Sequence, residues 1–553
     1  MTTMNKLFIL TLFISSSLLQ GLIGRAQTQA VYQAGSATVS LEPGPADFSL
    51  ALAGYGFPRG GRFSIDWKAA SLPLSKFKSG KTGKRWKAVA LANHFPTGTI
   101  SVTAYKNRLL ALTANDELYR LDAGNLKGEW IRFAAFNGSG YDVHLQSITI
   151  HSATLYGLSK DGKVYRAGHQ SSADLSARAL AISQGKSAIV MVGTDLCGFN
   201  HDFINSIKQE AYRRHGLNPE ALLINASHTH FAPATQDWTT WGSHQLPDTN
   251  YLNGVVRPAI LKAIALALKN RKPAWLSFGR GKTDIGHNRT LPGSDAPYDN
   301  DLDVLQVERT GDHSKSLVFL TGCHPVFKNE GAEGFTLSAN YPGITRALLQ
   351  QEAGIGDALF LQGCGGDINP VSTDHVKTGT DLAANVRSIL RQPMQQISGG
   401  INFHVDSVQF PVKPWSREQI AAFRKENDNG RGDVTAEKNV RWSDLMTRLD
   451  QQGRMPRTMP VYMQTLNIGN WKLVGISRET VTSYSLAVKQ LWPGKLVSVA
   501  GYCNDVSSYL PTSRHISAGV YEGNDSFFWY GQPSVFPLNV FETIIKQIKA
   551  NNH

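Results

Sequence analysis

The 553-residue chain has few cysteines, and no two of them have the spacing of a metal-binding pair. The four are Cys197, Cys323, Cys364 and Cys503. The absence of a Cys-x-x-Cys pair argues against a structural zinc knot. An even number of cysteines permits disulfides in an exported chain, and burial as small apolar side chains is the alternative. Both interpretations stay open from the sequence.

Long apolar runs are missing from the chain after its start, and no low-complexity segment is present. At the start, Lys6 precedes an apolar run over residues 7–22, and Gly24-Arg25-Ala26 places small residues at a suitable cleavage site. The run is too short and too rich in serine for a membrane span. We therefore predict a signal peptide over residues 1–26, no transmembrane segment, and a periplasmic or secreted mature protein.

Acidic residues are fewer than basic ones: 43 Asp and Glu against 56 Lys and Arg give a formal net charge of +13. Such a charge attracts anionic partners, including lipid headgroups, polyanionic glycans and nucleic acid. The basic residues are scattered, with short runs at 76–78 and 81–87, and no nucleic-acid-binding motif is present. We prefer a solvated basic face and expect no nucleic-acid partner. Contact with a membrane surface and the oligomeric state stay open.

Two stretches, 108–120 and 154–166, repeat a pattern of strand, polar turn and strand, and Asp161-Gly162 is a good hairpin signal. Their spacing is typical of β-propeller blades, but two copies cannot close a propeller. We predict a β-rich insertion over 61–172 that binds a ligand or shapes the mouth of a site.

The flanking segments, 27–60 and 173–553, alternate apolar runs suited to strands with helical patterns. Strands are predicted at 187–192, 221–226, 317–321 and 358–361, and helices at 204–215, 255–268, 342–351, 382–390 and 540–549. This alternation predicts an α/β fold, in which a sheet carries helices on its faces. Such folds place their functional side chains just after strand ends.

The strand at 221–226 leads into Ser227-His228-Thr229-His230. Two histidines that are two residues apart on an extended backbone point to the same side. They can chelate one divalent metal, or one can act as a ligand and the other as an acid or base. A histidine pair without a metal is the alternative.

Other strand ends carry His324, Asp367 and Glu479. Each has a plain structural explanation: a turn histidine before Pro325, a brace for a glycine-rich turn, and a helix-capping charge. Taken together, histidines and carboxylates suit a catalytic zinc, which keeps one position open for water.

The order of these motifs resembles the neutral, non-lysosomal ceramidase family, from about Ser36 to the C-terminus with the insertion excepted. The matching runs are Ala53-Gly54-Tyr55-Gly56, Ala177-Arg178-Ala179-Leu180, Gly193-Thr194-Asp195, Ser227-His228-Thr229-His230, Asn288-Arg289, His324-Pro325, Gly366-Asp367-Ile368-Asn369-Pro370, Ser477-Arg478-Glu479 and Tyr509-Leu510-Pro511-Thr512. We expect the resemblance to cover the catalytic domain of that family and not its C-terminal immunoglobulin-like domain.

The resemblance implies one zinc ion per chain, held by two histidines, a glutamate and a tyrosine. The implied ligands are His228, His324, Glu479 and Tyr509. For the tyrosine, Tyr502 and Tyr521 are nearby alternatives. The resemblance also implies that His230 lies beside the scissile group and that Arg289 lines the site.

One departure from the family changes the expected chemistry. The serine to which the family motif assigns a catalytic role is replaced by Asn369, whose amide is no nucleophile. We therefore expect attack by a zinc-activated water, since zinc lowers the pKa of bound water to about 7. We expect His230 to move the proton, Tyr509 or Arg289 to stabilise the oxyanion, and Asp367 to orient a histidine or the backbone. A Cys364 nucleophile is the alternative.

The leading hypothesis is thus an exported zinc-dependent hydrolase that cleaves the N-acyl bond of a small-molecule or lipid-like substrate. A second is a zinc-dependent esterase or deacylase acting on a glycan or another acylated substrate. A third is a non-catalytic binding protein on the same scaffold. The presence of all four implied ligands argues against the third.

Overall fold

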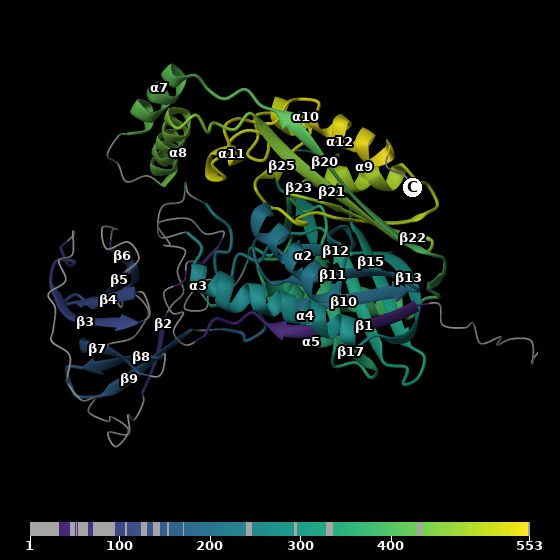
Figure 1. The fold of residues 1–553 in the computed structure, drawn as a ribbon, viewed down its shortest axis with the longest axis horizontal. Helices are drawn as coiled ribbons and strands as arrows, with labels where there is room; N and C mark the ends of the chain where they lie inside the picture. Colours follow the sequence, from purple (N-terminus) through teal and green to yellow (C-terminus); the bar gives the residue numbers. More distant parts are fainter. Residues whose placement is uncertain are drawn as a thin grey trace, which may run out of the picture.

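The computed structural model describes residues 32–44, 50, 52–53, 65–69, 94–105, 108–122, 130–135, 144–151, 154–169, 171–238, 240, 246–291, 293, 296–327, 336–428 and 434–550. The predicted signal peptide and the basic runs at 76–78 and 81–87 lie outside these residues. A large α/β body fills most of Figure 1, and a pair of small sheets lies to one side of it. The predicted α/β fold with a β-rich inserted segment is confirmed.

A nine-stranded sheet is the largest in the described chain, with the order β12-β11-β10-β1-β13-β15-β16-β17 and β19 beside β13. The strands are β1 (Tyr32–Ser40), β10 (Ser176–Gln184), β11 (Ser187–Thr194), β12 (Leu222–Ala226), β13 (Lys272–Lys282), β15 (Asp301–Arg309), β16 (Lys315–Thr321), β17 (Ile355–Gln362) and β19 (Gln395–Ile397). The pairs β11–β12 and β16–β17 are parallel, and the other pairs are antiparallel. The four strands predicted from apolar runs all belong to this sheet, and their buried residues form its core.

Helices cover the faces of this sheet: α2 (His201–His215), α4 (Arg257–Lys269), α5 (Asn340–Leu349) and α6 (His375–Leu390). Helix α2 ends where Gly216 takes a left-handed conformation (φ 65°), which suits a residue without Cβ. The short segments α3 (Thr249–Tyr251) and η6 (Leu252–Val256) continue into α4. Together they form a 21-residue helix that is long and apolar enough to cross a membrane by length and composition. Helix α4 packs its apolar face against β1 and β10, as a core helix does.

A second sheet has the order β20-β21-β22-β24 and carries α9 and α12. Its elements are β20 (Ile401–Pro411), β21 (Thr458–Ile468), β22 (Trp471–Ile476), β24 (Leu496–Ala500), α9 (Thr482–Gln490) and α12 (Val540–Ala550). Between β20 and β21 the chain forms a helical hairpin of α7 (Arg417–Asn427) and α8 (Val434–Gln451). Helix α7 begins with a capping box between Ser416 and Gln419.

The two repeats form corresponding hairpins in a pair of four-stranded antiparallel sheets. The sheets contain β2 (Ile65–Ala69), β9 (Val164–His169), β8 (Thr154–Ser159) and β7 (Leu145–His151), and β3 (Thr99–Tyr105), β4 (Arg108–Thr113), β5 (Glu117–Asp122) and β6 (Ile131–Ala135). Buried leucines of β4, β5, β7 and β8 form a core shared by the two sheets. Arg108 and Arg120 pair with Asp248, just before α3, so buried charges tie these sheets to the body.

Candidate metal centre

The main sheet curves so that β12 and β17, at opposite ends of its strand order, come into contact. The buried amide of Asn225 joins them: its Nδ2 donates to Gln362 O (3.2 Å), and its Oδ1 accepts from Gln362 N (2.8 Å). The same Nδ2 donates to Gly501 O just after β24 (2.7 Å). The approach also explains Gly193, because a Cβ there would lie 2.4 Å from Phe360 O of β17. The ends of three strands therefore meet at one place.

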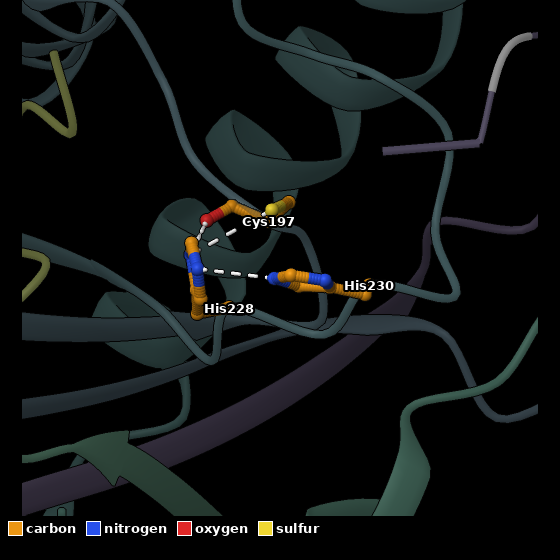
Figure 2. A group of neighbouring side chains, drawn as sticks. All are labelled: Cys197, His228 and His230. Atoms are coloured by element: carbon orange, nitrogen blue, oxygen red, sulfur yellow. Dashed lines mark hydrogen bonds between the residues drawn. The ribbon is translucent and has the colours of Figure 1, made fainter. Parts of the chain in front are cut away.

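The two histidines after β12 do not lie on an extended backbone, and that prediction is wrong. Strand β12 ends at Ala226, and His228 takes a left-handed conformation (φ 66°) while its N–H donates to Leu196 O (3.0 Å). The rings nevertheless converge, with the two Nε2 atoms 3.3 Å apart (Figure 2). A turn held by tertiary hydrogen bonds, and not the alternation of a strand, brings them together.

The position of the proton on His228 follows from its surroundings. Its Nδ1 lies 2.6 Å from Cys197 O and 3.6 Å from Cys197 Sγ (Figure 2). A backbone carbonyl only accepts, so Nδ1 carries the hydrogen. The Nε2 of the neutral ring is then a free electron pair, as in a metal-ligating histidine.

His324 follows β16 and is oriented in the same way. Its Nδ1 lies 2.7 Å from Gly365 O, and the side chain is completely buried. Both free Nε2 atoms face one oxygen of Glu479: Oε2 lies 3.1 Å from His228 Nε2 and 3.2 Å from His324 Nε2. We name His228, His324 and Glu479 the metal cluster, because one ligand atom from each lies within 4.8 Å of the others.

The metal cluster has the donor set and spacing of a zinc site. Three electron-rich atoms face one another in a buried place, which is unfavourable unless a proton or a cation lies between them. Zinc–nitrogen bonds of about 2.0–2.1 Å in a tetrahedron place the ligand atoms about 3.3 Å apart, close to the measured separations. Burial and nearby Arg289 lower the pKa of His324 to about 4, so this ring is neutral at neutral pH. Burial would raise the pKa of Glu479, but His228 and His324 outweigh it, and the carboxylate stays charged.

Glu479 is presented by a short element next to the second sheet. Strand β23 (Glu479–Thr480) pairs in parallel with β25 (Tyr509–Leu510). The preceding residue, Arg478, has a left-handed conformation (φ 71°) and is buried. Left-handed residues other than glycine are costly and occur often at functional sites. Here His228 belongs to the metal cluster, and Arg478 directly precedes its member Glu479.

Arg289 forms the centre of a second group of side chains beside the metal cluster. It follows β14 (Gly286–Asn288), which pairs with β18 (Ile368–Pro370). Its guanidinium donates to Glu522 Oε1 (3.1 Å), Asn369 Oδ1 (3.0 Å), Gly366 O (3.0 Å) and the Tyr509 hydroxyl (2.9 Å). We name Arg289, Asn369, Tyr509 and Glu522 the arginine cluster. Asn369, at the position of the family serine, thus accepts a hydrogen bond from Arg289.

Asp367 braces the backbone around the site. Its Oδ1 accepts from Thr482 N (2.7 Å), and its Oδ2 accepts from Asn288 Nδ2 (2.9 Å). The same Oδ2 lies 3.4 Å from Nε2 of the buried His515. Its two oxygens thus join Asn288, which precedes Arg289, to Thr482, three residues after Glu479.

Sequence reasoning missed two residues that complete these contacts. Glu522 forms an ion pair with Arg289. In this segment the sequence had indicated only the adjacent Tyr521. Tyr530 donates its hydroxyl to Glu479 Oε1. Tyr502 packs its ring 4.7 Å from that of His228, and its buried hydroxyl has no partner among the described residues. Tyr509, the predicted ligand, has its hydroxyl bonded to Arg289.

No protein-family model and no curated protein sequence matches the chain. Solved structures that resemble it include two ceramidases. One is neutral ceramidase from Pseudomonas aeruginosa, with a TM-score of 0.53, 17% identity and 68% of each chain covered. The other is a ceramidase complexed with C2, with a TM-score of 0.54, 17% identity, and 68% of this chain and 69% of that chain covered. The chain has a ceramidase-like fold.

Within this ceramidase-like fold the four cysteines are buried and free, so burial replaces the disulfide alternative. Cys364 packs in the core of the second sheet beside Val474 and Val499. Burial raises the pKa of its thiol well above the usual value. A buried thiol that resists ionisation is a poor nucleophile, which argues against the Cys364 alternative.

Proposed function

We propose that this protein is an exported zinc-dependent hydrolase that cleaves the N-acyl bond of an amide, as a ceramidase does. One observation carries the proposal: the Nε2 atoms of His228 and His324 converge on Glu479 Oε2 while their Nδ1 atoms are tied to backbone carbonyls. This is how proteins orient histidines that bind zinc. The fold shared with ceramidases supports the amide as the scissile group.

Zinc held by His228, His324 and Glu479, with Tyr509 as the further candidate ligand, would polarise an acyl carbonyl and acidify a water molecule. His230 is the group that we assign to proton transfer. Burial and the neighbouring His228 and His324 lower its pKa well below the usual value, so its ring rests neutral and readily gives up any proton that it takes from the attacking water. It can then return that proton to the leaving amine.

Arg289 supplies fixed positive charge on the other side of the site. Its bonds to Glu522 and Asn369 hold the guanidinium, and its bond to Tyr509 orients that hydroxyl. Donors held in place before the reaction stabilise a developing oxyanion without reorganisation. Asp367 fixes the same region through Thr482 and Asn288.

A second candidate is an esterase or deacylase acting on a glycan or another acylated substrate. It is favoured by Asn369, which removes the family serine and instead bonds to Arg289. It is also favoured by the inserted β sheets, which the pairing of Arg108 with Asp248 ties to the body. A non-catalytic binding protein is the least favoured, since His228, His324 and Glu479 converge in one buried group.

The test is a substrate screen with purified protein, metal-free and after addition of zinc. It would include ceramides, N-acyl amino acids, acylated sugars and simple esters. We expect zinc-dependent release of a fatty acid from an amide, and a loss of about 100-fold or more in turnover on His230→Ala. Ester-only cleavage would select the second candidate. Stoichiometric zinc in a His228→Ala/His324→Ala variant would reject the metal cluster.

Export is tested separately, by N-terminal sequencing of the native protein. We expect the mature chain to begin near Gln27, outside the cytoplasm, because residues 1–26 have the pattern of a signal peptide. A native soluble form that keeps Met1 would reject export and leave the hydrolase proposal untouched.

A further inference from the structure

We propose that Tyr530 is the positioning residue of Glu479, and that the α7–α8 hairpin holds Tyr530 in place. The proposal rests on the proposed metal site and adds to it the side chains that set the orientation of its carboxylate. None of these residues follows from the motifs that predicted the site.

The two oxygens of Glu479 have separate partners. Oε2 faces His228 and His324, and Oε1 accepts the hydrogen bond of the Tyr530 hydroxyl. A hydrogen bond to one oxygen fixes the rotation of the carboxylate about its last bond, so the other oxygen stays directed at the histidines. Without it, Glu479 could turn or offer both oxygens to a cation.

The ring of Tyr530 is held by other aromatic rings. Trp238 lies edge-on, with centroids 6.1 Å apart and planes at 85°. Tyr509 of the arginine cluster makes a similar contact at 6.1 Å and 84°. Such edge-to-face pairs favour one ring orientation. The phenol therefore reaches Glu479 from a fixed direction.

The backbone on both sides of Tyr530 is tied to helix α8. Trp442, which is completely buried, donates its Nε1 hydrogen to Gln532 O (2.8 Å). Arg441 donates to Thr240 O (2.7 Å), and the Thr240 hydroxyl donates to Trp529 O. The residues before and after the Tyr530–Gly531 turn are thus both linked to one helix.

An aromatic core stiffens this connection. Trp442 packs against Phe423, Phe527 and Phe528, joining α7, α8 and α11 (Ser526–Trp529). In Figure 1 the hairpin lies at the edge of the body, with α11 next to α8. The α7–α8 hairpin, which lies between β20 and β21 in the sequence, is thereby connected to Glu479 through Tyr530.

The experiment compares zinc affinity in two tyrosine-to-phenylalanine variants of the whole chain. Tyr530→Phe removes only the hydroxyl that contacts Glu479. Tyr251→Phe is the matched control, because its buried hydroxyl donates to Leu41 O (2.7 Å) beside the main sheet. Affinity is measured by competition with a chromophoric chelator. Loss of an outer partner of a ligand typically weakens metal binding about 10- to 100-fold, and we expect this for Tyr530→Phe alone.

A third variant, Trp442→Phe, replaces the indole with a smaller aromatic ring and removes the bond to Gln532. We expect it to weaken zinc binding less than Tyr530→Phe does, since Tyr530 keeps its aromatic neighbours. If Tyr530→Phe does not fold, this variant decides: unchanged zinc affinity would overturn the role of the hairpin and with it the proposal.

Glu479→Gln separates this proposal from the proposed function. Loss of zinc in Glu479→Gln with unchanged affinity in Tyr530→Phe would overturn the positioning role and keep the metal site. Unchanged zinc in both variants would overturn the metal site itself. Equal weakening in Tyr530→Phe and Tyr251→Phe would indicate a general loss of structure and also overturn the positioning role.

Discussion

The metal cluster and the arginine cluster are neighbours, yet their polar atoms are satisfied in opposite ways. In the arginine cluster every bond joins a donor to an acceptor, with Arg289 donating to Glu522, Asn369 and Tyr509. In the metal cluster the Nε2 atoms of two histidines face one acceptor oxygen of Glu479, and the contact needs a cation or, without metal, the proton that His228 takes up. Burial makes the difference important, since an unmatched polar contact costs more away from water.

The positions of the hydrogens distinguish a set of metal ligands from a structural ion pair. Both groups contain a buried carboxylate and a nitrogenous partner. Arg289 can only donate, so its bond to Glu522 Oε1 joins a donor to an acceptor without any further group. When neutral, the rings of His228 and His324 carry their one hydrogen on Nδ1, toward the carbonyls of Cys197 and Gly365, so a proton or a cation must lie between their Nε2 atoms and Glu479. A cation site can therefore be recognised when the histidine hydrogens point to backbone carbonyls and the other ring nitrogens face a carboxylate.

We expect the largest effect from a substitution in the metal cluster. Glu479→Gln keeps the shape of the side chain and removes its charge. We expect zinc affinity to fall by more than the roughly 100-fold that loss of an outer partner causes, because a ligand is lost. Calorimetry and elemental analysis measure this. Zinc bound as tightly as in the unaltered protein would show that the three side chains are not its ligands.

The second effect breaks the arginine cluster. Arg289→Met leaves the buried carboxylate of Glu522 without its charge partner. Breaking a fully buried pair costs about 3–5 kcal/mol of unfolding free energy, and we expect a smaller loss here because the Arg289 side chain is 22% exposed. Urea unfolding of the metal-free protein measures it. The control is Arg289→Met with Glu522→Gln, which should regain part of the loss. Zinc stoichiometry should persist in both, and a stability equal to that of the unaltered chain would contradict the buried pairing.

The third prediction concerns pH, to which the two clusters should respond differently. In the metal-free protein burial opposes protonation of His228, but Cys197 and Glu479 outweigh it and raise its pKa well above the usual value. Zinc must displace that proton, so its apparent affinity should fall about tenfold for each pH unit below this pKa. The metal-free protein should show the reverse trend, losing stability as pH rises through the same pKa.

The arginine cluster should not respond over this range. Burial disfavours the charge of Arg289, yet Tyr509 and Glu522 raise its pKa, so it stays protonated. Zinc titrations from acid to alkaline buffer, with chelator competition, test the contrast. A zinc affinity independent of pH would contradict the proton on His228.

The smallest effect lies outside both clusters. Cys364→Ala removes a buried sulfur from the core of the second sheet and should cost about 1–2 kcal/mol of unfolding free energy, as a small cavity does. Turnover on the substrate found by the screen should stay within a few-fold. A folded, zinc-loaded Cys364→Ala variant without activity would restore the thiol nucleophile, and a trapped thioester would establish it.

Particular residues mark the limits of prediction from sequence. The alternation at 187–226 predicted β11, α2 and β12, because apolar periodicity reports burial directly. The backbone at His228 was predicted as extended and is a left-handed turn, since its hydrogen bond goes to Leu196 and not to a neighbour in sequence. Tyr530 and Glu522 could not be predicted as site residues, because no motif around either one distinguishes it from the other tyrosines and glutamates of the chain.

Local periodicity and side-chain chemistry predicted four strands of the main sheet, the helices that follow them, the repeated hairpins and the residue types that a metal site needs. Which of those side chains meet depends on contacts between segments that are distant in the sequence. Curvature of the main sheet and the amide of Asn225 bring strand ends 137 residues apart into contact. The proton on each histidine, the partner of Arg289 and the hold of Tyr530 on Glu479 all depend on that contact, because hydrogen-bond geometry between distant segments exists only after folding.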